Sequence, residues 1–212
     1  MVRDSHKRRK SGGSAPAGQS GRRGLREEIA YRAARLIAEE GLTDFAAAKK
    51  KAVRQMGELE NASLPDNHEI EAALRTHQSL FQSYTQPEEC RALRQIAVDV
   101  MRRLNHFSPW LIGSVLGGSA NRFSPIELEI VGDDAKQLEM YFLNEGVLFD
   151  TRVARTRVGD EMEDISTYEI TFEEIPVVIA FYPQHAVRFA RRPRVSLAHA
   201  RAQLKTVELL LV

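Results

Sequence analysis

The sequence predicts an α+β protein with helices in its N-terminal part and a small mixed β-sheet in its C-terminal part. Between residues 25 and 106, apolar residues recur at spacings of three and four, which is the helical period. After Pro109, short apolar or alternating runs separated by turn residues are typical of strands. The 212 residues, 43% hydrophobic and 28% charged, are sufficient for a buried core.

Residues 1–24 differ in composition from the remainder of the chain. They contain seven lysines and arginines against the single acid Asp4, whereas the whole chain carries a net charge of only +1. Because this Gly- and Ser-rich segment offers little apolar surface to bury, we expect a disordered basic tail. Such a tail suits electrostatic attachment to RNA, DNA or an acidic membrane surface, although a solvated extension is the simpler interpretation.

The composition also bears on localisation. No apolar run approaches the roughly 18 residues that a membrane span needs. No apolar segment follows the basic N-terminus, so a secretory signal is not expected. The single cysteine, Cys90, allows no intramolecular disulfide. These features favour a cytoplasmic protein without a membrane span, and they leave the oligomeric state open.

Four helices are expected in the region 25–106. The first ends at Gly41, a residue suited to a helix C-terminus, and the second begins at Thr43 or Asp44 and ends at Gly57. The third and fourth follow from two apolar stripes, which contain Ile70, Leu74, His77, Phe81 and Tyr84, and then Leu93, Ile96, Ala97, Val100, Met101 and Leu104. The simplest interpretation is that these helices pack on one another as a bundle.

The region 107–212 is expected to form the sheet domain. Its predicted strands cover residues 110–114, 126–131, 147–158, 168–172 and 177–182, with a hairpin connection over 173–176. A helix is expected from Asp133 or Asp134 to Asn144, and another from Ser196 onwards.

The stretch from Gly113 to Ile130 carries the chemistry. A strand that ends in Gly-Ser and turns into a short helix exposes backbone N–H groups and a hydroxyl, and this geometry suits a phosphate. The predicted phosphate-binding residues are Gly113, Ser114, Gly117, Gly118 and Ser119.

Two acidic residues follow in the next predicted strand. Glu127 and Glu129 are two residues apart, so both carboxylates point from the same face of that strand. Paired carboxylates beside a phosphate loop can hold Mg²⁺ for nucleotidyl transfer. Glu127 and Glu129 are therefore the predicted catalytic and metal-binding residues.

This region resembles the nucleotidyltransferase superfamily, which includes polymerase beta, the aminoglycoside nucleotidyltransferases and the minimal bacterial nucleotidyltransferases. Their signature is an apolar strand, Gly-Ser, a Gly-containing turn and then Asp-x-Asp in an apolar strand. Gly113 and Ser114 match the Gly-Ser pair, and Ser124 precedes the acidic strand. The resemblance implies a nucleotidyltransferase-like topology for residues 107–212, with a nucleotide (NTP) or a nucleic acid as partner.

The carboxylate set departs from the superfamily pattern. In the commonest register the first metal-binding acid falls on Pro125 and the second on Glu127, and a shift of two residues pairs Glu127 with Glu129. The position of the third acid is occupied by Val178, for which Glu169 is the only nearby substitute. No general base is then evident. The resemblance therefore implies a divergent protein that binds a nucleotide or a nucleic-acid phosphate through a weak metal site, and it leaves open whether nucleotidyl transfer is retained.

A second hypothesis rests on the N-terminal helices. The segment from Ile29 to Thr43 looks somewhat like the opening of a TetR-type helix-turn-helix, and Lys49, Lys50, Lys51 and Arg54 are suited to contact phosphates. In this alternative the protein is a nucleic-acid-binding regulator, and the sheet serves dimerisation. The N-terminal pattern also resembles that of a family of proteobacterial proteins. The chain has neither a Gly-x-x-x-x-Gly-Lys-[Ser/Thr] loop nor a His/Cys pattern with zinc spacing.

Overall fold

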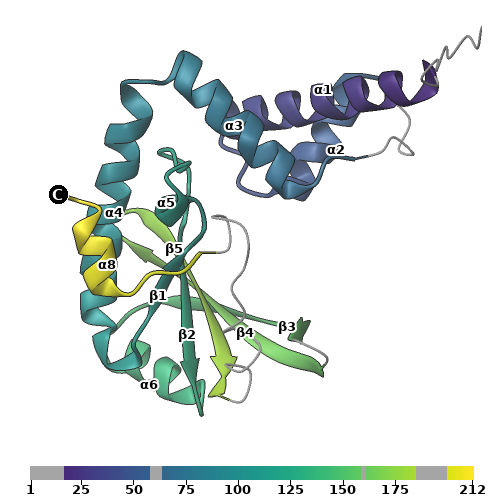
Figure 1. Ribbon diagram of the computed structural model, residues 1–212. Coiled ribbons are helices and arrows are strands. Elements are labelled where there is room, and N and C mark those ends of the chain that lie inside the picture. Colours follow the sequence, from purple (N-terminus) through teal and green to yellow (C-terminus); the bar gives the residue numbers. More distant parts are fainter. Residues whose placement is uncertain (1–16, 58–63, 159–160, 185–199) are drawn as a thin grey trace, which may run out of the picture.

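The computed structural model describes residues 17–57, 64–158, 161–184 and 200–212. The described part is an α+β structure in which helices α4, α6 and α8 pack on one side of a five-stranded mixed sheet (Figure 1). Helix α1 (Ala17–Glu40) begins eight residues before the expected start at Leu25. The tail was predicted over residues 1–24; residues 17–24 belong to α1, and residues 1–16 lie outside the described residues, as does the expected helix start at Ser196. None of the described helices is long and apolar enough to cross a membrane.

Helices α1, α2 (Phe45–Gln55) and α3 (Asn67–Phe81) form one body, which we call the helical unit. Gly41 ends α1 with a φ of +72°, as its position in the sequence predicts. Asp44 caps α2, and Asp66 caps α3 in a reciprocal capping box with Glu69. The three helices share an apolar core that includes Ile29, Ala33, Leu36, Ile37, Ala48, Ala52, Ile70 and Leu74.

Helix α4 (Thr85–Arg103) packs differently from the expected bundle. Its stripe, which includes Leu93, Ala97 and Met101, is buried in the same core as the strands and not in that of the helical unit. Figure 1 shows α4 running along the sheet while α1–α3 extend away from it. The strands present a broad apolar face, and helical periodicity alone does not reveal which apolar surface a stripe will cover.

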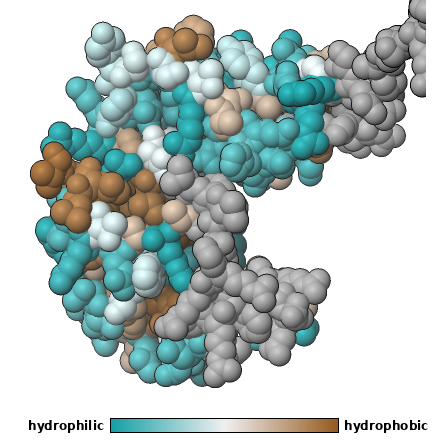
Figure 2. All heavy atoms as spheres, viewed as in Figure 1, coloured by the Kyte–Doolittle hydropathy of each residue, from teal (hydrophilic) through white to brown (hydrophobic). Residues whose placement is uncertain are grey.

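The third-helix stripe also ends earlier than predicted. Ile70, Leu74 and His77 are buried, but Phe81 and Tyr84 are exposed. The chain turns from α3 into α4 at this point, so the last members of the stripe extend past the core. Figure 2 shows apolar side chains at the surface of this corner, and a second apolar area at the C-terminal end beside α8 (Leu204–Leu209).

The sheet has the strand order β1-β2-β5-β4-β3. Strand β2 runs parallel to β5, and the other neighbouring pairs are antiparallel. The elements of this part are η1 (Asn105–Phe107), β1 (Trp110–Ile112), α5 (Gly113–Gly117), β2 (Ile126–Gly132), α6 (Lys136–Asn144), β3 (Phe149–Val158), β4 (Glu161–Phe172) and β5 (Ile175–Pro183).

One face of the sheet is apolar and carries the core. Ile126, Leu128 and Ile130 of β2 are buried with α4 and α6, so Glu127 and Glu129 lie on the opposite face. The hairpin between β4 and β5 turns at Glu173 and Glu174, whose positive φ values match the turn type that two-residue hairpins favour. Strand β4 begins well before the expected residue 168, because its first half pairs with β3. This half is polar, so the apolar pattern of the sequence does not reveal it.

Candidate functional site

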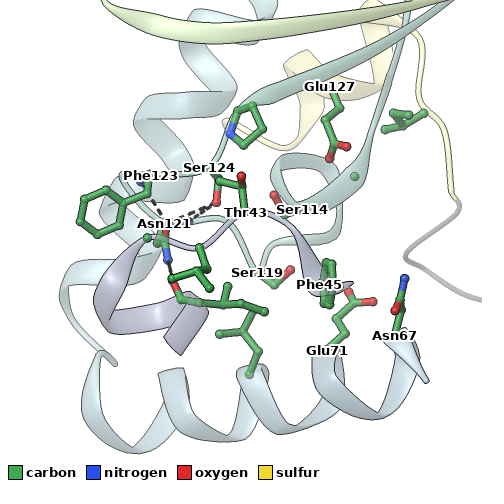
Figure 3. A pocket seen from close by; sticks show the side chains of 17 residues that line it. Thr43, Phe45, Asn67, Glu71, Ser114, Ser119, Asn121, Phe123, Ser124 and Glu127 are labelled. Atoms are coloured by element: carbon green, nitrogen blue, oxygen red, sulfur yellow. Dashed lines mark hydrogen bonds between the residues drawn. The ribbon is translucent and has the colours of Figure 1, made fainter. Parts of the chain in front are cut away.

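A cavity of about 300 Å³ lies where the helical unit meets the loop after β1 (Figure 3). The sheet side of the cavity is lined by the predicted site residues Gly113, Ser114, Ser119 and Glu127. Gly117 and Gly118, also predicted to bind phosphate, do not line it. Its volume is near the lower end of the range for small-molecule sites, so it suits a single small ligand.

Glu127 occupies the wall of this cavity beside the Gly-Ser turn. A β-carbon on residue 113 would come within 1.7 Å of the Oε2 of Glu127, so the carboxylate lies directly against Gly113. The backbone N–H of Ser114 donates a hydrogen bond to the same carboxylate. Figure 3 shows the side chain of Glu127 directed toward Ser114. The acid and the Gly-Ser pair that the sequence separates by 13 residues are thus in contact.

The environment of Glu127 changes its acidity. Burial raises the pKa of this carboxyl above its ordinary value, and the hydrogen bond from the Ser114 backbone acts in the opposite direction. A carboxylate that has lost hydration gains more from a bound cation than an exposed one does, because fewer water contacts must be given up. Glu127 is therefore an acidic group of the cavity that could hold a metal ion.

The loop that follows α5 closes on its own carbonyl group. The N–H groups of Gly118, Ser119 and Ala120 all point to the carbonyl oxygen of Ser114, at distances of 2.9, 3.1 and 3.2 Å. These amides are therefore engaged within the loop and are not directed at the cavity. The sequence had suggested Gly117, Gly118 and Ser119 as amide donors to phosphate; in the structure this part of the loop instead fixes the position of Ser114.

Side chains from α3 and α4 hold the carbonyl groups of α5 and of the loop that follows it. Gln86 donates through Nε2 to the carbonyls of Gly118 and Ala120, at 2.9 and 2.7 Å. Three further donors complete the contacts, namely Arg75 to Gly117, Gln78 to Ser119 and Arg94 to Val115 and Leu116. Since buried carbonyls require partners, these donors determine the conformation of the loop.

Glu129 has a different environment from Glu127, although the two share one face of β2. It is buried, lies 3.9 Å from Nη1 of Arg201 and does not line the cavity. Arg201 also covers the ring of Trp110, 4.8 Å from its centroid. The predicted catalytic and metal-binding pair is therefore divided between a cavity and an ion pair. Among the described residues there is no group of three His, Cys, Asp or Glu side chains arranged to hold a metal.

The register places the position expected for a third acid next to Glu127. Val178 of β5 pairs directly with Glu127, and Glu169 of β4 pairs with Val178. Glu169 is therefore two strands away from Glu127, and the spacing between strands places their backbones roughly 10 Å apart. The Oε1 atom of Glu169 lies 3.4 Å from Nη1 of Arg152. Glu169 does not share a site with Glu127, so it does not replace the acid that Val178 lacks.

The helical unit supplies the opposite wall of the cavity, which the sequence did not indicate. This wall contains Ile37, Gly41, Leu42, Thr43, Phe45, Asn67, Glu71 and Leu74. Thr43 and Asn67 are next to helix caps, so their polarity was explained locally by capping. A further polar group, Asn121, accepts the N–H of Phe123 and donates to the carbonyl of Ile37. No local pattern predicts that these residues meet.

The basic residues of the alternative hypothesis lie on α2. Lys49 donates to Oδ1 of Asn67, and Lys51 forms an ion pair with Glu40. Two of the proposed phosphate contacts thus have partners within the helical unit. A recognition helix after Gly57 would fall partly on residues 58–63, which lie outside the described residues.

Comparison of the chain with protein-family models, with curated proteins and with solved structures gave no match.

Proposed function

We propose that this chain is a divergent nucleotidyltransferase-type protein that binds one nucleotide in the cavity between the helical unit and the Gly113–Ser114 turn. In this proposal the phosphates would lie at the sheet wall, and Glu127 would hold a divalent cation, Mg²⁺, whose charge would offset that of the phosphates. The observation that carries the proposal is the contact between the Glu127 carboxylate, Gly113 and the Ser114 amide at the edge of the cavity.

The strand arrangement supports the same assignment. The superfamily signature places Gly-Ser after a first strand, acids on a second strand and a further acid on a later one. Here β1 leads into Gly113, β2 carries Glu127, and β5 lies parallel to β2 with Val178 opposite Glu127. Gly113, Ser114 and Glu127 line the cavity, and Val178, which stands in place of the last acid, pairs with Glu127 on the neighbouring strand.

Charge explains why the cation is required. The described residues that line the cavity include the carboxylates of Glu71 and Glu127 but no lysine or arginine. A nucleotide phosphate would be repelled by this wall without a positive ion between them. Magnesium is bound by few carboxylates together with substrate phosphates and water, so a single acid such as Glu127 is sufficient for binding.

The same residues do not support the two-metal transfer reaction. That mechanism requires carboxylates to hold both ions and a base for the attacking hydroxyl. Glu129 is paired with Arg201, and Val178 has no acidic function. We therefore assign nucleotide binding, without nucleotidyl transfer, as the function of the cavity.

The test is nucleotide binding measured by calorimetry with and without Mg²⁺. We expect binding of ATP that requires Mg²⁺, and a loss of at least tenfold in affinity for Ser114→Ala and for Glu127→Gln, since hydrogen bonds to charged groups contribute about 1.5–3 kcal/mol. Ser79→Ala on the outer face of α3 and Asp150→Asn on β3 are matched controls, because both residues are exposed and outside the cavity.

No affinity for any NTP at millimolar concentration would contradict the proposal. Binding that Glu127→Gln leaves unchanged would contradict the role of this carboxylate. Incubation with labelled NTPs and Mg²⁺ or Mn²⁺ tests the catalytic part, for which we expect no transfer of label. Salt-sensitive DNA binding, lost when Lys49, Lys50 and Lys51 are neutralised, would instead support the regulator hypothesis.

A further inference from the structure

We propose that the wall contributed by the helical unit is a nucleobase subsite, in which the base lies against the ring of Phe45 and its edge contacts Asn67 and Glu71. This inference rests on the proposed function, because the phosphates then occupy the opposite wall at Ser114. The ligand class that follows is a mononucleotide with its base attached, as opposed to a free phosphate or polyphosphate.

Phe45 has the properties of a stacking surface. Its side chain is half-buried, packs against the core of the helical unit and lines the cavity. Among the described residues its ring has no aromatic partner, unlike the rings around Tyr141 and Phe142. Figure 3 places Phe45 between Ser119 and Asn67 at the helical side of the cavity. Every nucleobase has a flat face that stacks on such a ring.

Asn67 supplies a directed hydrogen-bond donor beside this ring. Its Oδ1 accepts from Nζ of Lys49 at 2.8 Å, which leaves the Nδ2 group to donate to a ligand. Lys49 is one helical turn after Phe45 on α2, so this hydrogen bond links the two helices next to the ring. The amide is thereby held at the mouth of the cavity with its donor available to a ring nitrogen or carbonyl of a base.

Glu71 supplies an acceptor one turn further along α3. It is only 9% exposed, and its Oε1 accepts from Nη2 of Arg75 at 2.8 Å. Its other oxygen has no hydrogen-bond partner among the described residues, although the side chain lines the cavity. A carboxylate oxygen accepts a hydrogen bond from an N–H donor. The wall therefore offers the Nδ2 donor of Asn67 and a carboxylate acceptor of Glu71. The edge of a nucleobase carries both an acceptor and a donor, so it can pair with both groups.

The two walls are held at a fixed separation. Gln78 donates to the carbonyl of Ser119 at 2.8 Å, and Asn121 donates to the carbonyl of Ile37 at 3.2 Å. Both bonds connect the helical unit to the loop that follows α5, and both side chains are buried. The polar wall at Ser114 and the aromatic wall at Phe45 consequently face one cavity whose size suits one nucleotide.

The experiment compares three probes, namely inorganic triphosphate, ATP and adenosine, each titrated in the presence of Mg²⁺. We expect ATP to bind about tenfold more tightly than triphosphate, within the range for one base stacked on an aromatic ring. Phe45→Leu keeps an apolar side chain but removes the ring, and it should abolish this difference while the affinity for triphosphate stays the same.

Phe81→Leu is the matched control. Phe81 is an exposed phenylalanine at the end of α3 and does not line the cavity. This variant should retain the tenfold preference for ATP. If Phe45→Leu does not fold, Asn67→Ala on the exposed start of α3 provides a second test, with about a threefold loss for ATP and none for triphosphate.

The outcomes separate the two proposals. Equal affinities of ATP and triphosphate, unaffected by Phe45→Leu, would overturn the base subsite and leave the proposed function intact. Absence of binding of all three probes would overturn both. Binding of adenosine that Phe45→Leu removes, without any binding of triphosphate, would support the base subsite and overturn the phosphate site.

Discussion

The carboxylate of Glu127 lies so close to Gly113 that no other residue fits at position 113 without moving it. A β-carbon there would be 1.7 Å from Oε2 of Glu127, and Gly113 also has a φ of +70°. Two separate requirements, backbone conformation and space, thus select glycine at the start of α5. Substitution of either Gly113 or Glu127 therefore disturbs the same contact.

Gly113→Ala should lower the free energy of unfolding by the roughly 1–2 kcal/mol that a left-handed conformation costs a residue with a side chain, plus the cost of moving the flexible end of Glu127 away from Ser114. Gly146→Ala is the matched control, because Gly146 has a similar φ of +67° but no atom within 4 Å of the added β-carbon. Urea denaturation of both variants separates the two terms. Equal losses would show that the contact with Glu127 has no energetic consequence.

Glu127→Gln should stabilise the protein at neutral pH in the absence of metal. Burial raises the pKa of Glu127 above 4.5, so the native state holds this proton more tightly than the unfolded state. Stability therefore falls as the pH rises from 4.5 through the native pKa, and the loss is complete above it. Glutamine has no such titration. Thermal melts as a function of pH should show the variant ahead at pH 7 and the difference vanishing below pH 4.5; a constant difference would contradict this.

Gln86→Ala should destabilise the loop that carries Ser114. Both carbonyls that Gln86 contacts, those of Gly118 and Ala120, would lose their donor. We expect a loss of about 2 kcal/mol, since a buried polar group without a partner costs about 1–3 kcal/mol. Gln137→Ala on the exposed face of α6 is the control. Hydrogen exchange of the Ser119 amide should accelerate in Gln86→Ala alone.

Tyr168→Phe should lower the stability of the protein at neutral pH and remove the decline in stability that the unmodified protein shows in alkali. Burial raises the pKa of Tyr168 to about 12, and its hydroxyl donates to Oε1 of Glu139 at 2.9 Å. The native state retains the phenol proton between pH 10 and 12 while the unfolded state releases it, so stability falls over this interval. The variant should lose about 1 kcal/mol at pH 7 and lack this alkaline decline. An identical decline in both proteins would exclude Tyr168 as its source.

Local patterns predicted much of the secondary structure and one part of the site. Gly41 and the acidic caps Asp44 and Asp66 mark helix ends in the sequence because they act on neighbouring backbone groups. The alternation of β2 likewise placed Glu127 and Glu129 on one face of a strand. Such features depend only on residues close together in the chain, so the sequence reveals them.

Tertiary structure decided which partner each of these groups received. Glu127 contacts Gly113, whereas Glu129 forms an ion pair with Arg201. Both glutamates lie on the same face of β2, so the alternation of the strand does not predict which partner each one has. Helix α4 is buried in the core of the sheet and not in that of α1–α3, although its stripe has the same period as theirs. Phe45 of α2 lines the same cavity as Glu127 of β2. These contacts join segments distant in sequence, and their free energy depends on surfaces that exist only once the chain has folded.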